Sequence, residues 1–297
     1  QEILEVSQKV SESKSTIVCW AMGITQHKNS VATIQEIVNF LLLGGNIGRK
    51  GAGVCPVRGH SNVQGDRTVG INHKPSPDFI NNLERSTGIR SPERHGFDSV
   101  EAVKAMEKGD AKVFLAMGGN FLSAMSDTNR TSAALSTCNL TVHISTKPNR
   151  SHLITGKTGI ILPCLGRTEE DISLSNGSQF VTVENSMGVV HSSTGTFKPA
   201  SNLLKSEPAI VSGIGGAIES RLERSGIPWE NLSEDYDLIR NLIEKTIPGF
   251  DDYNVRIKSK SGFYLPNPPR DSRTFPTGNG YANFVCNEIS FAKSSNK

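Results

Sequence analysis

The segment from Cys55 to Asp66 carries the densest group of chemically capable side chains in the sequence. Arg58 supplies a guanidinium, His60 an imidazole, and Asn62 and Gln64 supply amides. A guanidinium can hold a carboxylate or phosphate through two parallel hydrogen bonds, and nearby glycines let the backbone approach a large polar ligand. A polar surface loop would have a similar composition, but the density of these residue types favours a ligand-binding loop.

Two further polar turns follow predicted strands. Gly118-Gly119-Asn120 comes after an apolar strand predicted at 112–117, and Thr146-Lys147-Pro148-Asn149 comes after one predicted at 140–144. In a parallel sheet such turns lie on the same edge and can share one ligand. Taken alone, the first turn fits a glycine-dependent strand-to-helix connection equally well, and the second fits a solvated basic loop.

The elements that would position these turns alternate along the chain. The predicted strands are 16–22, 112–117, 140–144 and 159–162, and the predicted helices begin at Ser30, Ser99 and Asp127. Serine and aspartate are good residues to precede a helix, and Gly44-Gly45 and Gly109 would end two of these helices. This alternation predicts an α/β fold with doubly wound, mostly parallel sheets of the dinucleotide-binding type and an irregular C-terminal segment.

The remaining segments show less regular patterns. We expect surface loops at 66–94, irregular structure at 166–177, short strands at 180–183 and 189–190, and helices at 207–223 and from Ser233 to about 245. The expected organisation has four parts: the end of one cofactor-binding domain, a second cofactor-binding domain, a connecting region, and a linker or start of a C-terminal domain. Their boundaries are 1–65, 66–165, 166–250 and 251–297.

Charge and cysteine usage narrow the functional classes. The net charge of +3, from 32 basic and 29 acidic residues, is too balanced to indicate nucleic-acid binding. The longest apolar run, at 40–43, is far too short for a membrane span. The five scattered cysteines and seven histidines lack the spacing of a metal site, so we expect a cytoplasmic protein with reduced, mostly buried thiols.

The polar turns, taken in this order, resemble the molybdopterin oxidoreductase superfamily, and formate-dehydrogenase-like alpha subunits in particular. The resemblance is most specific over 45–65, and it extends more weakly to about residue 200 and into the tail. The segments that carry it are Trp20-Ala21-Met22-Gly23-Ile24-Thr25-Gln26, Gly45-Asn46-Ile47-Gly48 with Gly51-Ala52-Gly53, Pro56-Val57-Arg58-Gly59-His60-Ser61-Asn62-Val63-Gln64-Gly65, Met117-Gly118-Gly119-Asn120, Ile161-Leu162-Pro163 and Asn185-Ser186-Met187-Gly188-Val189-Val190-His191.

The resemblance implies a bis-molybdopterin guanine dinucleotide cofactor with molybdenum or tungsten. Arg58 matches an arginine that orients the substrate carboxylate beside the metal, and His60 stands where the best-known formate dehydrogenases have glutamine. This departure leaves formate itself open as the substrate. By the same resemblance, Gly23, Gln26, Asn62 and Gln64 would line the pterin region, while Gly118, Gly119 and Asn120 would meet one dinucleotide arm and Thr146, Lys147 and Asn149 its nucleotide end.

The family's metal ligand, a cysteine or selenocysteine, and its 4Fe-4S cluster motif lie upstream of Trp20 in the resemblance. We therefore expect an internal piece of a longer alpha subunit, inactive alone, that acts on a small anionic substrate and works with electron-transfer subunits. The alternative is a non-catalytic α/β nucleotide-binding module. An ordinary nicotinamide dehydrogenase is disfavoured, because no G-x-G-x-x-G motif follows a strand at the required place.

Overall fold

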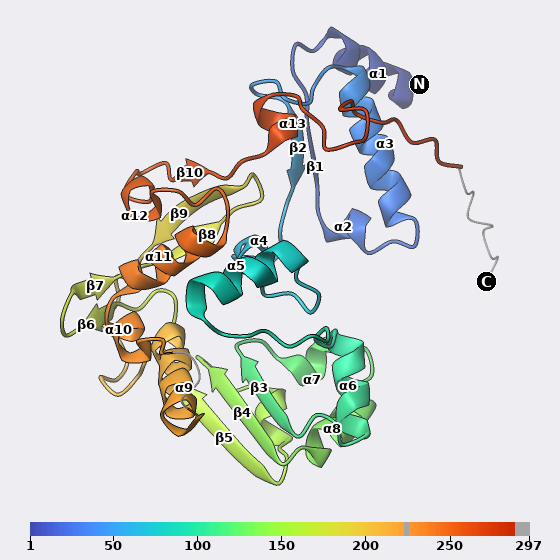
Figure 1. Ribbon diagram of the computed structural model, residues 1–297. Helices are drawn as coiled ribbons and strands as arrows, with labels where there is room; N and C mark the ends of the chain where they lie inside the picture. The colour runs from blue at the N-terminus through green and yellow to red at the C-terminus, as the bar shows by residue number, and fades with distance from the viewer. Residues whose placement is uncertain (223–225, 289–297) are drawn as a thin grey trace. The chain divides into compact units, whose positions relative to one another are not determined.

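The computed structural model describes residues 1–222 and 226–288 (Figure 1). The chain divides into two compact units. The first consists of Gln1–Gly65, Val183–Val190 and Gly262–Lys297, and the second of Asp66–Thr182 and His191–Ser261. Small parallel sheets surrounded by helices confirm the predicted α/β class.

The first unit is organised around a two-stranded parallel sheet. Strand β1 (Ile17–Trp20) pairs with β2 (Gly53–Pro56), so that Ile17 lies opposite Gly53 and Trp20 lies opposite Pro56. The predicted helix between them is α3 (Ser30–Leu43), although Asn29, not Ser30, is its N-cap residue. The other elements of this unit are α1 (Glu2–Glu12), α2 (Met22–Thr25), β10 (Phe263–Tyr264) and α13 (Pro268–Asp271).

The second unit contains a three-stranded parallel sheet in the order β3-β4-β5. Its strands are β3 (Val113–Met117), β4 (Leu140–Ser145) and β5 (Thr158–Pro163), which confirms the three strands predicted here. The helical elements near it are α6 (Ser99–Glu107), α7 (Phe121–Ala124), α8 (Thr128–Thr137), the 3-10 helix η1 (Arg150–Leu153) and α9 (Glu207–Leu222). The predicted end of α9 at Glu223 lies outside the described residues.

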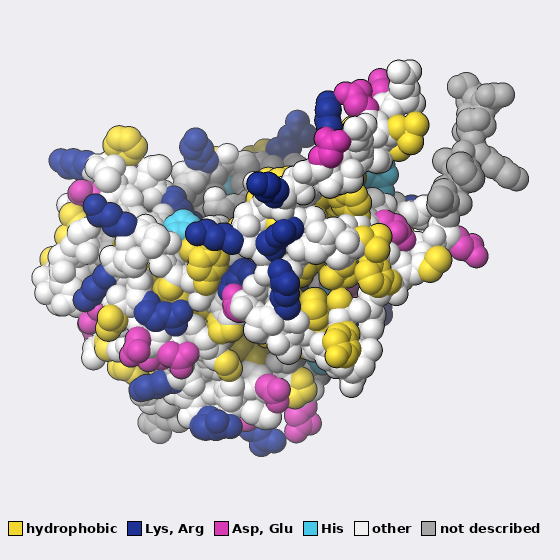
Figure 2. All heavy atoms as spheres, turned by 90° about the horizontal axis from the view of Figure 1, so that it is seen from above, with side chains coloured by type: hydrophobic (Ala, Val, Ile, Leu, Met, Phe, Trp, Pro, Cys, Tyr) yellow, Lys and Arg dark blue, Asp and Glu magenta, His cyan; other side chains and the backbone are white. Residues whose placement is uncertain are grey.

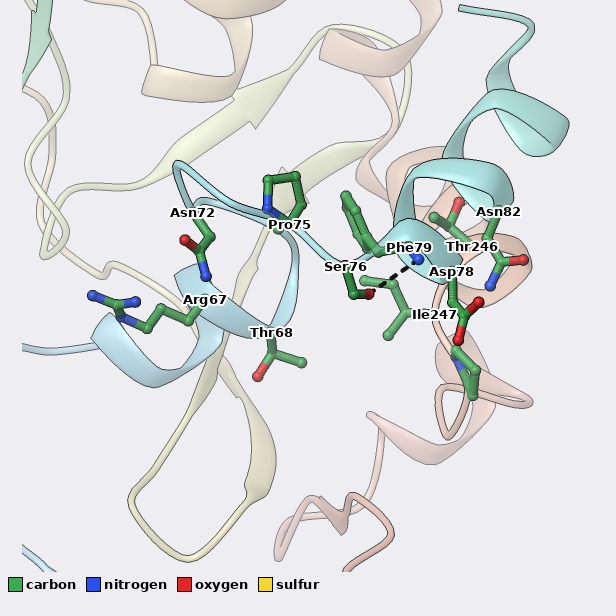
Figure 3. A pocket seen from close by; sticks show the side chains of 12 residues that line it. Arg67, Thr68, Asn72, Pro75, Ser76, Asp78, Phe79, Asn82, Thr246 and Ile247 are labelled. Carbon is green, nitrogen blue, oxygen red and sulfur yellow. Dashed lines mark hydrogen bonds between the residues drawn. The ribbon is translucent and has the colours of Figure 1, made fainter. Parts of the chain in front are cut away.

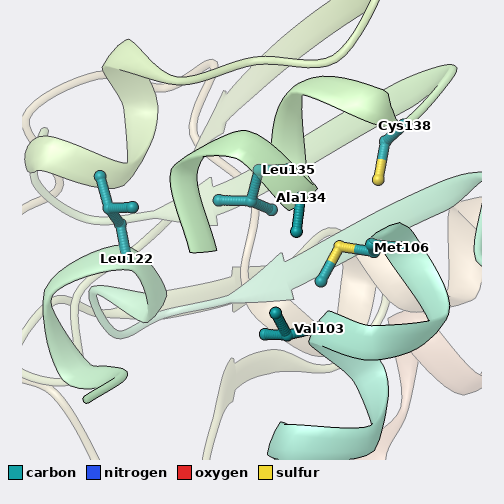
Figure 4. Close-up of a cluster of buried hydrophobic side chains, with 6 residues drawn as sticks. All are labelled: Val103, Met106, Leu122, Ala134, Leu135 and Cys138. Atoms are coloured by element: carbon teal, nitrogen blue, oxygen red, sulfur yellow. The ribbon is translucent and has the colours of Figure 1, made fainter. Parts of the chain in front are cut away.

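The core of the second unit lies between this sheet and its helices. On one face, apolar side chains of α6, α7 and α8 point toward one another and pack against Phe114 of β3 (Figure 4). On the other face, Ile210 of α9 packs against Val142 and Ile144 of the central strand. The central strand is consequently the most buried of the three, and the turns at its carboxyl end rest on a packed base.

Other elements complete the chain. A hairpin of β6 (Asp171–Ser173) and β7 (Gly177–Gln179) occupies the segment predicted to be irregular. The strands β8 (Val181–Glu184) and β9 (Val189–Ser193) match the two predicted short strands, and β10 pairs with β9 in antiparallel fashion. The remaining helices are α4 (Val63–Thr68), α5 (Pro77–Thr87), α10 (Trp229–Glu234), α11 (Tyr236–Thr246) and α12 (Tyr253–Arg256).

Other predicted helix starts, and a predicted loop region, were also wrong. Helix α6 is capped by Asp98, which forms a reciprocal capping box with Glu101, and α11 is capped by Asp235. In these two helices a carboxylate one residue before or two residues after the expected serine accepts hydrogen bonds from the free amides of the first turn. Residues 66–94, expected to be surface loops, include the amphipathic helix α5, which packs against α11.

Candidate functional site

The segment between β2 and α4, residues 57–62, is called the Arg58 loop, and it begins where the β1–β2 sheet ends. The Val57 amide donates a hydrogen bond to the Trp20 carbonyl at 2.7 Å, which continues the strand pairing one residue past β2. The short helix α2 lies beside this loop, since a Cβ added to Gly59 would be 3.2 Å from the Met22 methyl group. The structure therefore brings the predicted residues Gly23 and Gln26 of the α2 turn next to the Arg58 loop.

Arg58 and His60 are both exposed on this loop. The Arg58 guanidinium donates a hydrogen bond to the Gln64 side-chain oxygen at 2.8 Å. Because Gln64 belongs to helix α4, this bond restrains a long side chain that would otherwise sample many rotamers. A guanidinium carries five N–H donors, so Arg58 can donate to further groups while it holds this bond.

Asn62 fixes the other end of the same loop, directly before α4. Its backbone is left-handed, with a φ of 63°, and its side-chain oxygen accepts a hydrogen bond from the Glu184 amide at 3.0 Å. The absence of a side chain at Gly65 makes room for this contact, because a Cβ there would lie 2.1 Å from the same oxygen. Asn62 thus has a structural role in shaping the loop, which the sequence alone did not reveal.

The second group of predicted residues lies at the carboxyl edge of β3 and β4. The Gly118 amide donates to the Ile144 carbonyl at 2.8 Å, so the Gly118-Gly119 turn begins directly beside the end of the neighbouring strand. Both glycines have positive φ, 65° and 70°, and a Cβ added to either would meet open space. Glycine is needed here for its backbone conformation, and the turn leaves its backbone accessible.

Side-chain hydrogen bonds join this turn to the next one. The Asn149 amide donates to the Gly119 carbonyl at 2.8 Å, and the Ser151 hydroxyl donates to the Asn120 side-chain oxygen at 2.7 Å. Asn120 and Asn149 therefore fix the two turns as one rim, while Thr146 and Lys147 are exposed at its surface. The expectation that these turns share an edge is confirmed.

The chemistry of this rim fits the phosphate and amide groups of a nucleotide. Open backbone at Gly118 and Gly119 offers amide groups at the end of a parallel sheet, and Lys147 adds a cation on the same rim. The predicted site residues thus form two groups, one in each compact unit, and each group is locally well ordered by hydrogen bonds.

Two histidines beneath this rim are structural. His143 in β4 and His152 in η1 are buried, and their ring centroids are 4.9 Å apart. Burial, and secondarily the nearby His152, lower the pKa of His143 below its usual value. His143 is therefore neutral at pH 7, as a ring packed against Phe114 and another imidazole requires.

A cavity of about 290 Å³ lies in the segment that sequence reasoning treated as surface loops (Figure 3). It is bordered by α4, the turn that follows it, the first turn of α5 and the end of α11. Its lining includes Arg67, Asn72, Ser76, Phe79 and Thr246. The signal that could have located it is Ser76-Pro77, since serine before a proline is a typical helix start and places the apolar Phe79 on the inner face.

Sequence reasoning also missed a charged cluster in the second unit. Burial raises the pKa of Asp66, and the positive charge of Arg167 offsets part of this effect. Burial likewise raises the pKa of Glu207, with Arg167 lowering it and Asp66 raising it further. Asp66, which follows the Arg58 loop in the sequence, and Glu207 of α9 thus both lie within electrostatic reach of Arg167.

The surface and the possible metal-ligating groups were surveyed over the described residues. On the face shown in Figure 2, Lys and Arg side chains are spread among acidic and hydrophobic ones. Among residues 1–222 and 226–288, no group of three or more potential metal-ligating side chains comes together. Within the same residues, no helix is both long enough and apolar enough to cross a membrane.

Comparison with known proteins places the chain in a family. A sequence model of the family described as molybdopterin oxidoreductase matches residues 4–193. An uncharacterized oxidoreductase of Mycobacterium tuberculosis, Rv2900c, is 50% identical over 288 residues, covering 97% of this chain and 37% of that protein. Protein YdeP of Escherichia coli is 46% identical over 284 residues, covering 96% of this chain and 37% of YdeP.

A more distant relative from Bacillus subtilis carries the name "Putative formate dehydrogenase YrhE" and is 27% identical over 184 residues, covering 59% of this chain and 18% of YrhE. The chain belongs to the molybdopterin oxidoreductase family, as its resemblance to that family predicted. It spans 37% of the length of Rv2900c and 37% of the length of YdeP.

Proposed function

We propose that the chain forms part of the cofactor-binding region of a molybdenum or tungsten oxidoreductase of the formate-dehydrogenase-like type. The cofactor would be bis-molybdopterin guanine dinucleotide, which supplies two-electron redox chemistry when bound. The substrate would be a small anion. The metal ligand and any 4Fe-4S cluster would be contributed by other parts of the full-length protein.

The observation that carries this proposal is the restrained Arg58 on a loop at the carboxyl end of a parallel strand pair. Gln64 holds its guanidinium, and Asn62 and Gly65 shape the loop around it. A fixed positive charge of this kind draws an anion toward an oxidising centre and orients it for reaction. His60, exposed two residues away, would contact the same substrate or exchange a proton with it.

The rim at the ends of β3 and β4 would bind the nucleotide end of the cofactor. The Gly118 and Gly119 amides would meet phosphate oxygens, and Lys147 would neutralise part of their charge. Asn120 and Asn149 would hold the rim in shape and do so through hydrogen bonds already made within the protein. Gly23 and Gln26, beside the Arg58 loop, would line the pterin.

The test is Arg58→Lys in the full-length, cofactor-loaded enzyme, with kinetics measured on small carboxylate and other anionic substrates. We expect kcat/KM to fall by about 100-fold, a loss of about 2.7 kcal/mol, because lysine keeps the charge but loses the planar pair of donors. Molybdenum and guanine nucleotide content should stay normal. Arg90→Lys is the matched control, since Arg90 is an exposed surface arginine in an ion pair with Glu93.

Unchanged kinetics for Arg58→Lys would remove Arg58 from substrate orientation. A combined loss of metal, nucleotide and activity would instead assign Arg58 to cofactor binding. Normal Arg90→Lys kinetics are needed in either case to exclude a general effect of replacing arginine.

A further inference from the structure

Two cysteines lie side by side next to the Arg58 loop. In the parallel pairing of β1 and β2, Cys19 is in direct register with Cys55. Neighbouring strands lie about 4.8 Å apart, which falls inside the range of about 4.4–6.8 Å that disulfides bridge between Cα atoms. Because residues in register point to the same face of a sheet, the two thiols lie side by side on one face.

The thiols already interact in the reduced protein. The Cys19 side chain acts electrostatically on the Cys55 thiol. Burial, and secondarily this interaction, raise the pKa of the Cys55 thiol above its usual value, so Cys55 is a protonated thiol at neutral pH. The direct register of Cys19 with Cys55 brings the two side chains close without any rearrangement of the backbone.

Accessibility differs between the two positions. Cys19 is exposed and Cys55 is half-buried, whereas Cys138 and Cys164 are buried. The expectation that the thiols are mostly buried is therefore wrong for this pair and for Cys286, which is also exposed. An oxidant in solution would react first with the exposed Cys19. The neighbouring Cys55 could then react with the oxidised Cys19.

We propose that Cys19 and Cys55 form a reversible dithiol–disulfide site that responds to peroxides. The Cys19 thiolate attacks a peroxide oxygen, the O–O bond breaks, and Cys19 becomes a sulfenic acid as the first water is released. The Cys55 sulfur then attacks the sulfenic sulfur, the S–O bond breaks, an S–S bond forms, and the second water leaves. The two thiols lose two electrons and two protons, the peroxide gains them, and a low-molecular-weight thiol reverses the change by exchange.

The location gives this modification a consequence for the neighbouring loop. Cys55 is followed by Pro56 and Val57, and the Val57 amide is bonded to the carbonyl of Trp20, the residue after Cys19. A disulfide at this point would fix both strand ends at the base of the Arg58 loop. Oxidation would therefore change the mobility of the loop that carries the proposed substrate-binding arginine.

The test is non-reducing peptide mapping of the full-length protein after hydrogen peroxide treatment and blocking of remaining thiols. We expect a linked peptide pair containing Cys19 and Cys55, lost on adding dithiothreitol. It should be absent in Cys19→Ser and Cys55→Ser and retained in Cys286→Ser. Formation should be faster at pH 9 than at pH 7, since the thiolate is the reacting form.

Recovery of Cys19 and Cys55 as separately blocked or separately oxidised peptides, at a peroxide dose that oxidises Cys286, would overturn the proposal. A linkage of either residue to a cysteine other than its cross-strand neighbour would overturn it equally. The wild-type peptide map decides the matter even if a serine variant fails to fold. Because this map needs no activity, its outcome is independent of the proposed enzyme function.

Discussion

Asn62 should contribute to the free energy of unfolding in two separable ways. The first part is conformational: Asn62 has a φ of 63°, and alanine in this left-handed conformation is about 1 kcal/mol less stable than glycine. The second is the hydrogen bond from the Glu184 amide, at 3.0 Å. Leaving a buried donor without a partner costs about 1–3 kcal/mol.

Two substitutions separate these parts. Asn62→Ala loses both, so its free energy of unfolding should fall by about 2–4 kcal/mol, whereas Asn62→Gly loses only the hydrogen bond and should fall by about 1–3 kcal/mol. The glycine variant should therefore be the more stable of the two. We expect Gly65→Ala to resemble the hydrogen-bond loss alone, because its methyl group would displace the Asn62 oxygen.

The assay is urea unfolding followed by tryptophan fluorescence in a Trp229→Phe background. Trp20 lies in β1, in the same compact unit as Asn62, so this background reports on the relevant unit. Equal stability of the alanine and glycine variants would refute the conformational part of the reasoning. A loss below about 0.5 kcal/mol for both would refute the hydrogen-bond part.

Three further perturbations follow from the structure. Tyr236→Phe removes hydroxyl bonds to Asp171 and Ser206 in a buried setting and should lower the free energy of unfolding by about 1–3 kcal/mol, measured by urea denaturation; an unchanged midpoint would contradict this. Oxidation of the Cys19–Cys55 pair should stabilise the first unit by up to about 4 kcal/mol through loop closure, and equal unfolding midpoints with and without peroxide would count against it. Glu207→Gln should raise the free energy of unfolding at pH 7 and leave it nearly unchanged near pH 4. The reason is that a carboxyl with a raised folded-state pKa contributes stability that is present at low pH and lost as the pH rises. Calorimetry of both proteins at the two pH values tests this, and a larger stabilising effect at pH 4 than at pH 7 would contradict it.

Much of the second unit could be predicted from sequence because its elements carry strong local signals. Strand β3 is a continuous apolar run followed by Gly118, β4 has apolar residues at every second position, and β5 ends at Pro163. Parallel pairing then follows from the alternation of strands and helices. The same rule correctly placed the Gly118 and Lys147 turns on one edge.

The missed elements depend on tertiary pairing or on weaker signals. Strand β2 contains both glycine and proline, so only its pairing with β1 makes it a strand. Helix α5 was obscured by neighbouring proline, asparagine and charge, although Phe79, Ile80 and Leu83 have helical spacing. Its packing against α11 stabilises what local propensity left undecided.

The side-chain hydrogen bonds of the site could not be predicted from the sequence, and the reason is physical. The bond from Ser151 to Asn120 and that from Glu184 to Asn62 join residues far apart along the chain. No local pattern encodes such a contact, because it forms only after the elements have packed. The same holds for the Cys19–Cys55 register, which depends on the alignment of β1 with β2.

Metal and nucleotide analysis of the purified full-length protein tests the central claim most directly. If the two groups of turns serve a pterin nucleotide cofactor, molybdenum or tungsten should be present in proportion to the polypeptide, and acid release should yield guanine nucleotide. A protein that binds guanine nucleotide without either metal would contradict the account and favour a non-catalytic binding module.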